Sequence, residues 1–419
     1  MTPLRFCAGQ PMLRPISKRT TMLNKPGVTQ SLAHLIVATR WDNIPSAVRH
    51  QAKRSFMNFF AVALAGCRTG PVEIALRSLT EFSGDKQATV VGRAERIDAL
   101  SAAFLNAASA NVYDFCDTHV RTVIHPTSPV APALLAFAEL RRVSGCDLLL
   151  AFILGQEVQA RIGLAISPNH YNKGWHITST CGVFGAATGS GKLLALDETK
   201  MVWALGTAST QSSGLCECLG TPAKSVSVGN AARNGLWSAL LAEKGFDGPP
   251  EPLAGVQGFY HAMGEPPNLS LVTDGLGESW EIMQTSYKPY PCGFVIHPVL
   301  DCVLDWRRDN PKSDVTRVVV RGNPLLAART DRPNSSTGAS RKSACNMRWR
   351  RRWSPEKPGS ISSLTRARTI PRCWRCAERS RWCAIRHFPP SRRRSRSSPP
   401  MARPTSCRNR RRAAATPIR

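Results

Sequence analysis

Residues 111–126 gather several side chains that can exchange protons. The stretch reads Asn-Val-Tyr-Asp-Phe-Cys-Asp-Thr-His-Val-Arg-Thr-Val-Ile-His-Pro, and it contains Asp114, Asp117, His119 and His125, with the hydroxyl of Thr118 among them. Carboxyl and imidazole groups can act as acids and bases near neutral pH. Asp, Thr and Pro also cluster in polar turns, where their side chains hydrogen-bond nearby backbone amides. The stretch alone therefore indicates either an active-site loop or a structural turn.

Three further polar residues stand out in an otherwise apolar sequence. His176 follows Lys-Gly-Trp just before an expected helix, Lys224 lies in a Gly-, Pro- and Ser-containing segment shortly before another, and Lys288 opens Lys-Pro-Tyr-Pro-Cys-Gly. Taken singly, each lysine is explained as an ordinary surface residue, and His176 as a histidine that hydrogen-bonds at a helix end. Together with the loop, they would supply two cations for carboxylates and histidines for proton transfer.

The elements that must position these residues are mostly helices. Apolar residues recur at helical spacing from Gly27 to about Gly245. This pattern, together with capping residues and glycine stops, predicts helices over residues 29 or 31 to 40, 46–65, 98–110, 128–142, 146–164, 179–194, 197–213 and 228–243, and a short extended piece over 88–92. Small residues over 182–187 favour close helix packing. Residues 185–192 look like a phosphate loop, but their spacing does not fit one, so we interpret them as a helix end.

Beyond residue 258 the pattern changes from helical to mixed. Pro-rich loops lead to an extended piece over 281–287, a helix over 297–307 and a β-branched strand over 315–321. We therefore expect a mainly α protein with a large all-helical domain (23–265) and a smaller, incomplete α+β lid domain (266–333). Residues 1–22 are expected to be a disordered arm, and residues 334–419 a disordered, basic, low-complexity tail.

The net charge of +28 is concentrated in that tail. From Ser335 onward there are 24 Lys and Arg against two acidic residues, so the tail carries +22 and the rest of the chain +6. One hypothesis is a nucleic-acid arm that binds phosphates non-specifically. Cys373 and Cys376 lack the second pair that a zinc finger needs. Reading a back-translation of residues 346–365 one base earlier gives an Ala- and Leu-rich, helix-like string, which favours a frameshifted tail.

The cysteines, the first residues and the apolar runs indicate the cellular compartment. The fourteen cysteines are scattered, and no signal peptide is recognisable at the start. The longest apolar runs, residues 59–66 and 148–155, are shorter than the roughly 20 residues needed to cross a bilayer. We expect a reduced, cytoplasmic protein without a membrane partner.

In the order of its motifs, the chain resembles the MmgE/PrpD family, which includes 2-methylcitrate dehydratase and cis-aconitate decarboxylase. The resemblance covers about residues 23–333. It rests on Asp114-Phe-Cys-Asp-Thr118 with His125-Pro126, on Gly174-Trp-His176, on Lys224 with Gly229-Asn-Ala-Ala232, and on Lys288-Pro-Tyr-Pro-Cys-Gly293. Cys116 stands where family members often carry Asp, and Asn111 where many carry His.

The resemblance implies a homodimer with a site between helical domain and lid, and without metal or cofactor. It places Asp114, Thr118, His125, His176, Lys224 and Lys288 in that site. The lysines would hold the carboxylates of a small polycarboxylate, His125 and His176 would carry protons, Asp114 would orient or tune a histidine, and Thr118 would hydrogen-bond the substrate.

The reaction expected from the resemblance is loss of water from a di- or tricarboxylic acid such as 2-methylcitrate, by proton removal next to a carboxylate. The alternatives are a decarboxylase or isomerase of the same fold acting on a cis-aconitate-like acid, an inactive frameshifted remnant, and nucleic-acid binding through the tail.

Overall fold

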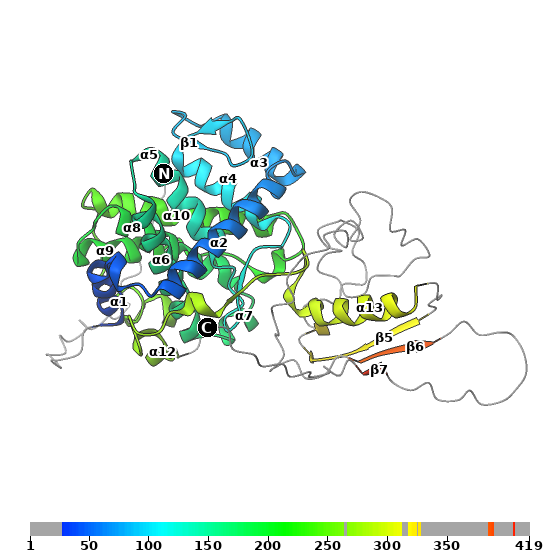
Figure 1. The fold of residues 1–419 in the computed structure, drawn as a ribbon. Coiled ribbons are helices and arrows are strands. Elements are labelled where there is room, and N and C mark those ends of the chain that lie inside the picture. Colours follow the sequence, from blue (N-terminus) through cyan, green and yellow to red (C-terminus); the bar gives the residue numbers. More distant parts are fainter. Residues whose placement is uncertain are drawn as a thin grey trace, which may run out of the picture.

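The computed structural model describes residues 27–263, 266–311, 317–324, 326–327, 384–388 and 405–406. As expected, the fold is mainly α, with the helices that precede α13 gathered in one body and α13 to one side of it (Figure 1). The helices are α1 (Val28–Ala38), α2 (Ser46–Gly66), α3 (Gly70–Thr80), α4 (Ala99–Asn111), α5 (Thr127–Leu140), α6 (Gly145–Ile166), α7 (Asn169–Asn172), α8 (Ile177–Leu193), α9 (Glu198–Ser209), α10 (Ala223–Glu243), α11 (Phe259–Met263), α12 (Ser270–Thr273) and α13 (His297–Asp309).

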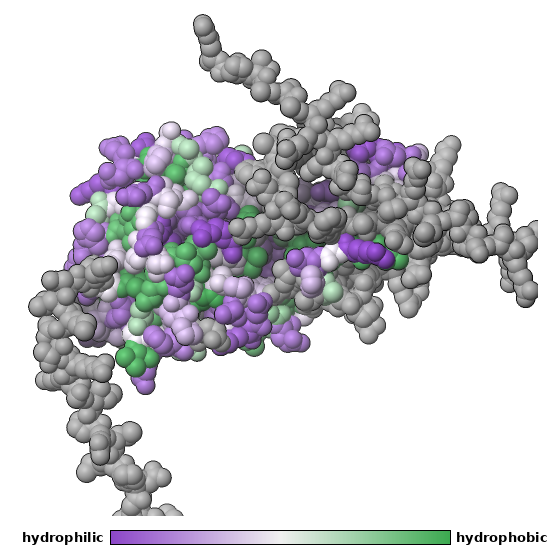
Figure 2. Space-filling model, turned by 90° about the horizontal axis from the view of Figure 1, so that it is seen from below, coloured by the Kyte–Doolittle hydropathy of each residue, from purple (hydrophilic) through white to green (hydrophobic). Residues whose placement is uncertain are grey.

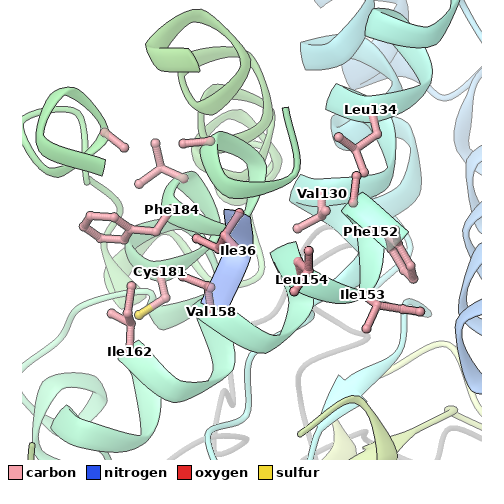
Figure 3. Packing of buried hydrophobic residues seen from close by; sticks show 14 of the residues in the cluster. Ile36, Val130, Leu134, Phe152, Ile153, Leu154, Val158, Ile162, Cys181 and Phe184 are labelled. Atoms are coloured by element: carbon pink, nitrogen blue, oxygen red, sulfur yellow. The ribbon is translucent and has the colours of Figure 1, made fainter. Parts of the chain in front are cut away.

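Helix α6 is the central element of the helical body. All of its residues from Leu150 to Ile166 are buried, which is the pattern of a helix that is covered on every side. Figure 3 shows side chains of α6 packed against α8, α5 and α1 in one apolar cluster. By length and composition α6 could cross a membrane, but 94% of its most apolar window is buried inside the fold. It is therefore the core helix of this body.

Small residues bring α6 and α8 into backbone contact. A Cβ added to Gly155 would lie 2.6 Å from the carbonyl oxygen of Gly185, and one added to Gly185 would lie 2.7 Å from the carbonyl oxygen of Gly155. Only glycine allows this approach on both sides. The small residues over 182–187 thus serve the close packing expected from the sequence.

The segment that resembles a phosphate loop has a structural role at the end of α8. Lys192 donates from Nζ to the carbonyl oxygens of Ile36, Val37 and Thr39, at 2.7, 3.0 and 2.8 Å. These groups belong to the last turn of α1, whose carbonyls have no partner within the helix. Lys192 therefore caps α1 rather than binding a nucleotide.

Strands are short and join distant parts of the chain. β1 (Ala88–Thr89) pairs antiparallel with β2 (Arg96–Ile97), and β3 (Thr118–His119) with β4 (Thr285–Ser286). β5 (Arg317–Arg321) pairs antiparallel with β6 (Ala384–Phe388), which pairs with β7 (Thr405–Ser406). This sheet lies beside α13, at one side of the helical body (Figure 1). β6 and β7 are strands within the tail expected to be disordered, and they are the part of it that the structure describes.

The surface mixes hydrophilic and hydrophobic residues on the face seen from below (Figure 2). Among the described residues, the exposed large apolar side chains include Met57, Phe60 and Leu64 of α2. Their spacing of three and four positions places them along one side of that helix.

Several sequence-based boundaries need correction. Helix α3 was not predicted. α1 begins after Gly27, and the expected cap Thr29 instead donates its backbone amide to the carboxylate of Glu251, at 3.1 Å. Of the extended piece expected over 281–287, residues Glu281–Gln284 form a 3-10 turn, and the Glu281 amide donates to the buried Glu157 carboxylate at 2.7 Å.

Candidate active site

The loop between α4 and α5 carries the first group of predicted site residues. Asp114 follows α4 and has a φ of 53°, a left-handed conformation that Asp tolerates better than most residues. Its backbone amide donates to the carbonyl oxygen of Asn111 at 2.9 Å. This turn directs the chain away from the helix axis, and the Asp114 side chain is 19% exposed.

Strand pairing brings the Lys288 motif to this loop. Thr118 of β3 lies opposite Ser286 of β4, so Lys288, two residues further on, arrives next to Asp114. The Lys288 ammonium donates to the backbone carbonyl of Asp114 at 2.9 Å. A two-residue antiparallel ladder thus brings together two residues that are 174 positions apart in the chain.

One carboxylate oxygen collects the charged groups of the site. Oδ1 of Asp114 lies 2.7 Å from Lys224 Nζ, 3.1 Å from Lys288 Nζ and 3.6 Å from His125 Nε2. Lys224 reaches it from the first turn of α10, which begins five residues earlier than expected and so contains this lysine. The Lys288 side chain is 1% exposed and that of Lys224 is 11% exposed. The main partners of Asp114 are therefore the lysines, whereas the sequence led us to expect a histidine.

The charges of this cluster determine its protonation. Burial alone would raise the pKa of Asp114, but Lys224 and Lys288 outweigh it and hold that pKa well below its usual range. Burial would lower the pKa of Lys224, but Asp114 raises it above its usual value. Asp114 is therefore ionised and Lys224 protonated at neutral pH, and together with Lys288 the cluster sets two lysines against one carboxylate.

Hydrogen bonding fixes the tautomer of His125. Its Nδ1 lies 2.9 Å from the backbone carbonyl of Asp117, which can only accept, so Nδ1 carries the hydrogen. The Thr118 hydroxyl lies 3.1 Å from the same nitrogen. Burial and the two lysines lower the pKa of His125 well below its usual value, so the ring is neutral. Its unprotonated Nε2 lies 3.6 Å from Asp114 Oδ1 and has a lone pair that can accept a proton.

The same reasoning applies to His176, the residue that precedes α8. Its Nδ1 lies 3.1 Å from the Ser179 hydroxyl and 3.2 Å from the Ser227 hydroxyl. Both hydroxyls already donate to carbonyl oxygens, those of His176 and Lys224, so both accept from Nδ1–H. Burial and then Lys224 lower the pKa of His176 to about 3. His176 is thus a second neutral histidine with a lone pair on Nε2.

Asp117 and His119 hold the loop in place. Asp117 accepts from the amide and hydroxyl of Thr127 at the start of α5, and burial raises its pKa to about 6. His119 bridges the Thr122 hydroxyl at 2.7 Å and the Glu281 carboxylate at 2.9 Å. These bonds tie the loop to α5 and to the segment before β4.

Some participants were not found from the sequence. Ser179 and Ser227 set the His176 tautomer, and each lies three positions after a predicted site residue, His176 or Lys224. That helical spacing was a usable signal. The carbonyl of Asp117, which orients His125, has no sequence signal, because any residue supplies a carbonyl.

The structure brings together Asp114, Thr118, His125, Lys224 and Lys288 by direct contacts. His176 joins them through Ser227 of α10, one turn after Lys224, and through the effect of the Lys224 charge on its ring. Within the described residues, no group of three His, Cys, Asp or Glu side chains is arranged to hold a metal ion. The arrangement can bind an anion and exchange protons with it.

Comparison with known proteins assigns the chain to a family. The MmgE/PrpD N-terminal domain matches residues 30–272, more than half of the chain. The chain belongs to the MmgE/PrpD family. The match includes the loop of Asp114, the start of α8 and the start of α10, but it ends before Lys288.

Several members of the family are similar to this chain. A cis-aconitate decarboxylase of Aspergillus terreus (strain NIH 2624 / FGSC A1156) is 32% identical over 302 residues, which are 69% of this chain and 62% of the relative. A cis-aconitate decarboxylase of Homo sapiens is 30% identical over 312 residues, 70% of this chain and 64% of the relative. The matched part of the chain thus spans less than two thirds of the length of these relatives.

Proposed function

We propose that the protein is a lyase that acts on a small polycarboxylic acid, with decarboxylation of cis-aconitate or a close analogue as its reaction. The observation that carries the proposal is the cluster of Lys224, Lys288 and Asp114 beside two neutral histidines. The names of the relatives support decarboxylation as the first reaction to test, ahead of the dehydration expected from the sequence.

The cluster suits an anionic ligand with more than one carboxylate. Two lysines share one carboxylate, so positive charge remains in a site where the Lys288 side chain is almost fully buried. Charges interact more strongly when they are shielded from water, so a ligand carboxylate gains more here than at the surface. The same positive charge would stabilise the enolate-like negative charge that develops during the reaction.

The histidines suit the proton transfers of a lyase. In decarboxylation the bond from carbon to one carboxylate breaks and CO₂ leaves. The electron pair spreads through the adjacent double bond toward a remaining carboxylate, and a proton then bonds to carbon. His125 or His176 would deliver that proton after taking it up from solution, since both rings are neutral in the free protein.

Dehydration remains the second candidate reaction, and the same groups support it. A neutral imidazole with a free Nε2 can remove a proton next to a carboxylate, while the second histidine, after taking up a proton from solution, protonates the leaving hydroxyl, which departs as water. Isomerisation would need the same proton removal and return. The geometry supports all three reactions, and the substrate decides between them.

The experiment is a substrate screen with the full chain. Cis-aconitate, 2-methylcitrate and citrate are each incubated with the protein, and products are followed by proton nuclear magnetic resonance. We expect a five-carbon unsaturated dicarboxylate from cis-aconitate, and its absence with Lys224→Ala. The exposed Lys53 of α2 offers a matched control, because Lys53→Ala removes a lysine that is open to solvent and, among the described residues, makes no hydrogen bond or ion pair with Asp114, Lys224 or Lys288. If folded wild-type protein turns over none of these acids, the proposal is wrong.

We also propose that the protein is a homodimer. This rests on the family resemblance, and light scattering after size-exclusion chromatography tests it. A mass of 45.8 kDa, that of one chain, would contradict it.

A further inference from the structure

A third histidine lies next to the candidate site. His297 is the first residue of α13 and is 6% exposed. Its ring lies edge-on to Tyr290, with centroids 5.4 Å apart and planes at 83°, and 5.2 Å from the ring of Phe294. These contacts hold the imidazole in one orientation at the end of the segment that Lys288 opens.

The Nε2 atom of His297 is buried and has no hydrogen-bond partner among the described residues. A buried polar atom without a partner destabilises a fold, so such atoms are uncommon unless a ligand or water hydrogen-bonds to them. The bonds that the ring makes to the backbone of Cys292 and Tyr290 must use the other nitrogen, Nδ1. A neutral ring therefore presents the lone pair of Nε2.

The surroundings of His297 are those of the site. Burial and the Lys288 ammonium lower its pKa to about 4, while the backbone of Cys292 and the Asp114 carboxylate act in the opposite direction. The titratable side chain in ring contact with it is that of Tyr290. The phenol is engaged, because it donates to the carboxylate of Asp301 at 2.6 Å. The charged groups that shift the His297 pKa are thus Lys288 and Asp114, which are already part of the site, whereas Asp301, one turn along α13, is bonded to the Tyr290 phenol.

We propose that His297 is a further ligand-binding residue and that its Nε2 holds a carboxylate of the bound polycarboxylate. The inference rests on the proposed function for the class of ligand. It assigns to His297 a direct contact that neither the sequence interpretation nor the family match gave it.

The contact requires a proton, because a carboxylate and an unprotonated Nε2 both only accept. A ligand carboxylate beside the ring offsets the repulsion from Lys288 and favours the imidazolium form. Nε2 then bonds a proton from solution and donates it in a charge-assisted hydrogen bond. Binding at neutral pH therefore takes up a proton, and no other bond is made or broken.

Calorimetric titration of the full chain with tricarballylate tests this. Tricarballylate is a saturated tricarboxylate without a hydroxyl or a double bond, so it reports binding without turnover. Titrations at pH 7 in PIPES and in ACES, which differ in ionisation enthalpy, give the number of protons taken up. They are repeated with His297→Gln, His297→Phe and, as a matched control, His261→Gln, which alters an exposed histidine bonded to the Gly255 carbonyl. Thermal unfolding of each variant verifies folding.

We expect the wild type and His261→Gln to take up more protons than His297→Gln, by as much as about one per site. The His297→Phe variant should bind roughly 10-fold to 100-fold more weakly, as expected for loss of a hydrogen bond to a charged group. Equal proton uptake and affinity in the wild type and His297→Gln would overturn the inference, as would a wild type that binds no tricarballylate. Binding with the expected differences but no turnover of any substrate would instead contradict the proposed reaction and leave the His297 contact standing.

Discussion

Lys224 Nζ lies 2.7 Å from Asp114 Oδ1, and this contact joins the first turn of α10 to the loop after α4. Lys288 lies 3.1 Å from the same oxygen, so one carboxylate compensates two buried cations. Each lysine keeps its position because Asp114 is there. The ion cluster therefore contributes to folding as well as to the proposed binding of an anion.

Replacing Asp114 should destabilise the protein. Asp114→Asn leaves two ammonium groups side by side without a carboxylate, and breaking a buried ion pair in this way costs roughly 3–5 kcal/mol. We expect the urea midpoint of unfolding to fall accordingly. The control is Asp305→Asn, which alters an exposed pair with Arg308 and should change the midpoint little. An unchanged midpoint in Asp114→Asn would show that the cluster does not stabilise the fold.

Removing the His125 imidazole should abolish most turnover while leaving the helices intact. General acid–base groups contribute about 10²-fold to 10⁴-fold to rate, so His125→Ala should lower kcat/KM by a factor in that range. Circular dichroism should show unchanged helix content. His34→Ala, which removes an exposed histidine paired with Glu198, should keep wild-type activity. Retained turnover in His125→Ala would exclude this residue as a proton carrier.

The sequence predicted the long helices because their apolar periodicity is a local property. It placed His176 correctly before α8, and it predicted α13 and β5. It could not show that Asp114 pairs with the lysines, because the β3–β4 ladder that brings Lys288 there joins residues more than 160 positions apart. Helix α3 was missed although its signal is local: Pro71 stands in its first turn, and the buried Val72 and Leu76 lie four positions apart, as on one face of a helix.

Other sequence-based expectations remain predictions. The frameshift hypothesis concerns residues 334–419, of which the structure describes only β6 and β7. The gene sequence between the codons of Arg332 and Asn346 tests it. The hypothesis is wrong if no base is inserted or deleted there relative to an open alternative reading frame. The domain boundary at residue 266 lies next to residues outside the described part of the chain.

The buried His176 should make stability depend on pH. Its folded pKa is about 3, below the value of about 6.5 expected in the unfolded chain. The unfolded state therefore binds a proton that the folded state does not, and stability falls as pH decreases below about 6.5. Between pH 7.5 and pH 5 this one group should cost about 2 kcal/mol.

His176→Gln removes that contribution, so comparing it with the wild type isolates the effect. Asp117 and Glu157, whose pKa values burial raises to about 6 and about 7, act in the opposite sense in both proteins and cancel in the comparison. Urea unfolding at both pH values should show a smaller loss in His176→Gln. Parallel losses in the two proteins would mean that the folded-state pKa of His176 is close to that of the unfolded chain.

The contact between α6 and α8 should not tolerate a single methyl group. A Cβ at position 155 would lie 2.6 Å from the Gly185 carbonyl oxygen and 2.8 Å from a methyl group of Val130, so the helices must separate. We expect Gly155→Ala to lower the free energy of unfolding by about 1–3 kcal/mol, the usual range for overpacking. Gly145→Ala, at the start of the same helix, is the matched control, because nothing lies within 4 Å of its added Cβ. Since α8 begins next to His176, a shift of α8 should also lower turnover in Gly155→Ala. Equal free energies of unfolding for Gly155→Ala and Gly145→Ala would show that the α6–α8 interface accommodates the added methyl group.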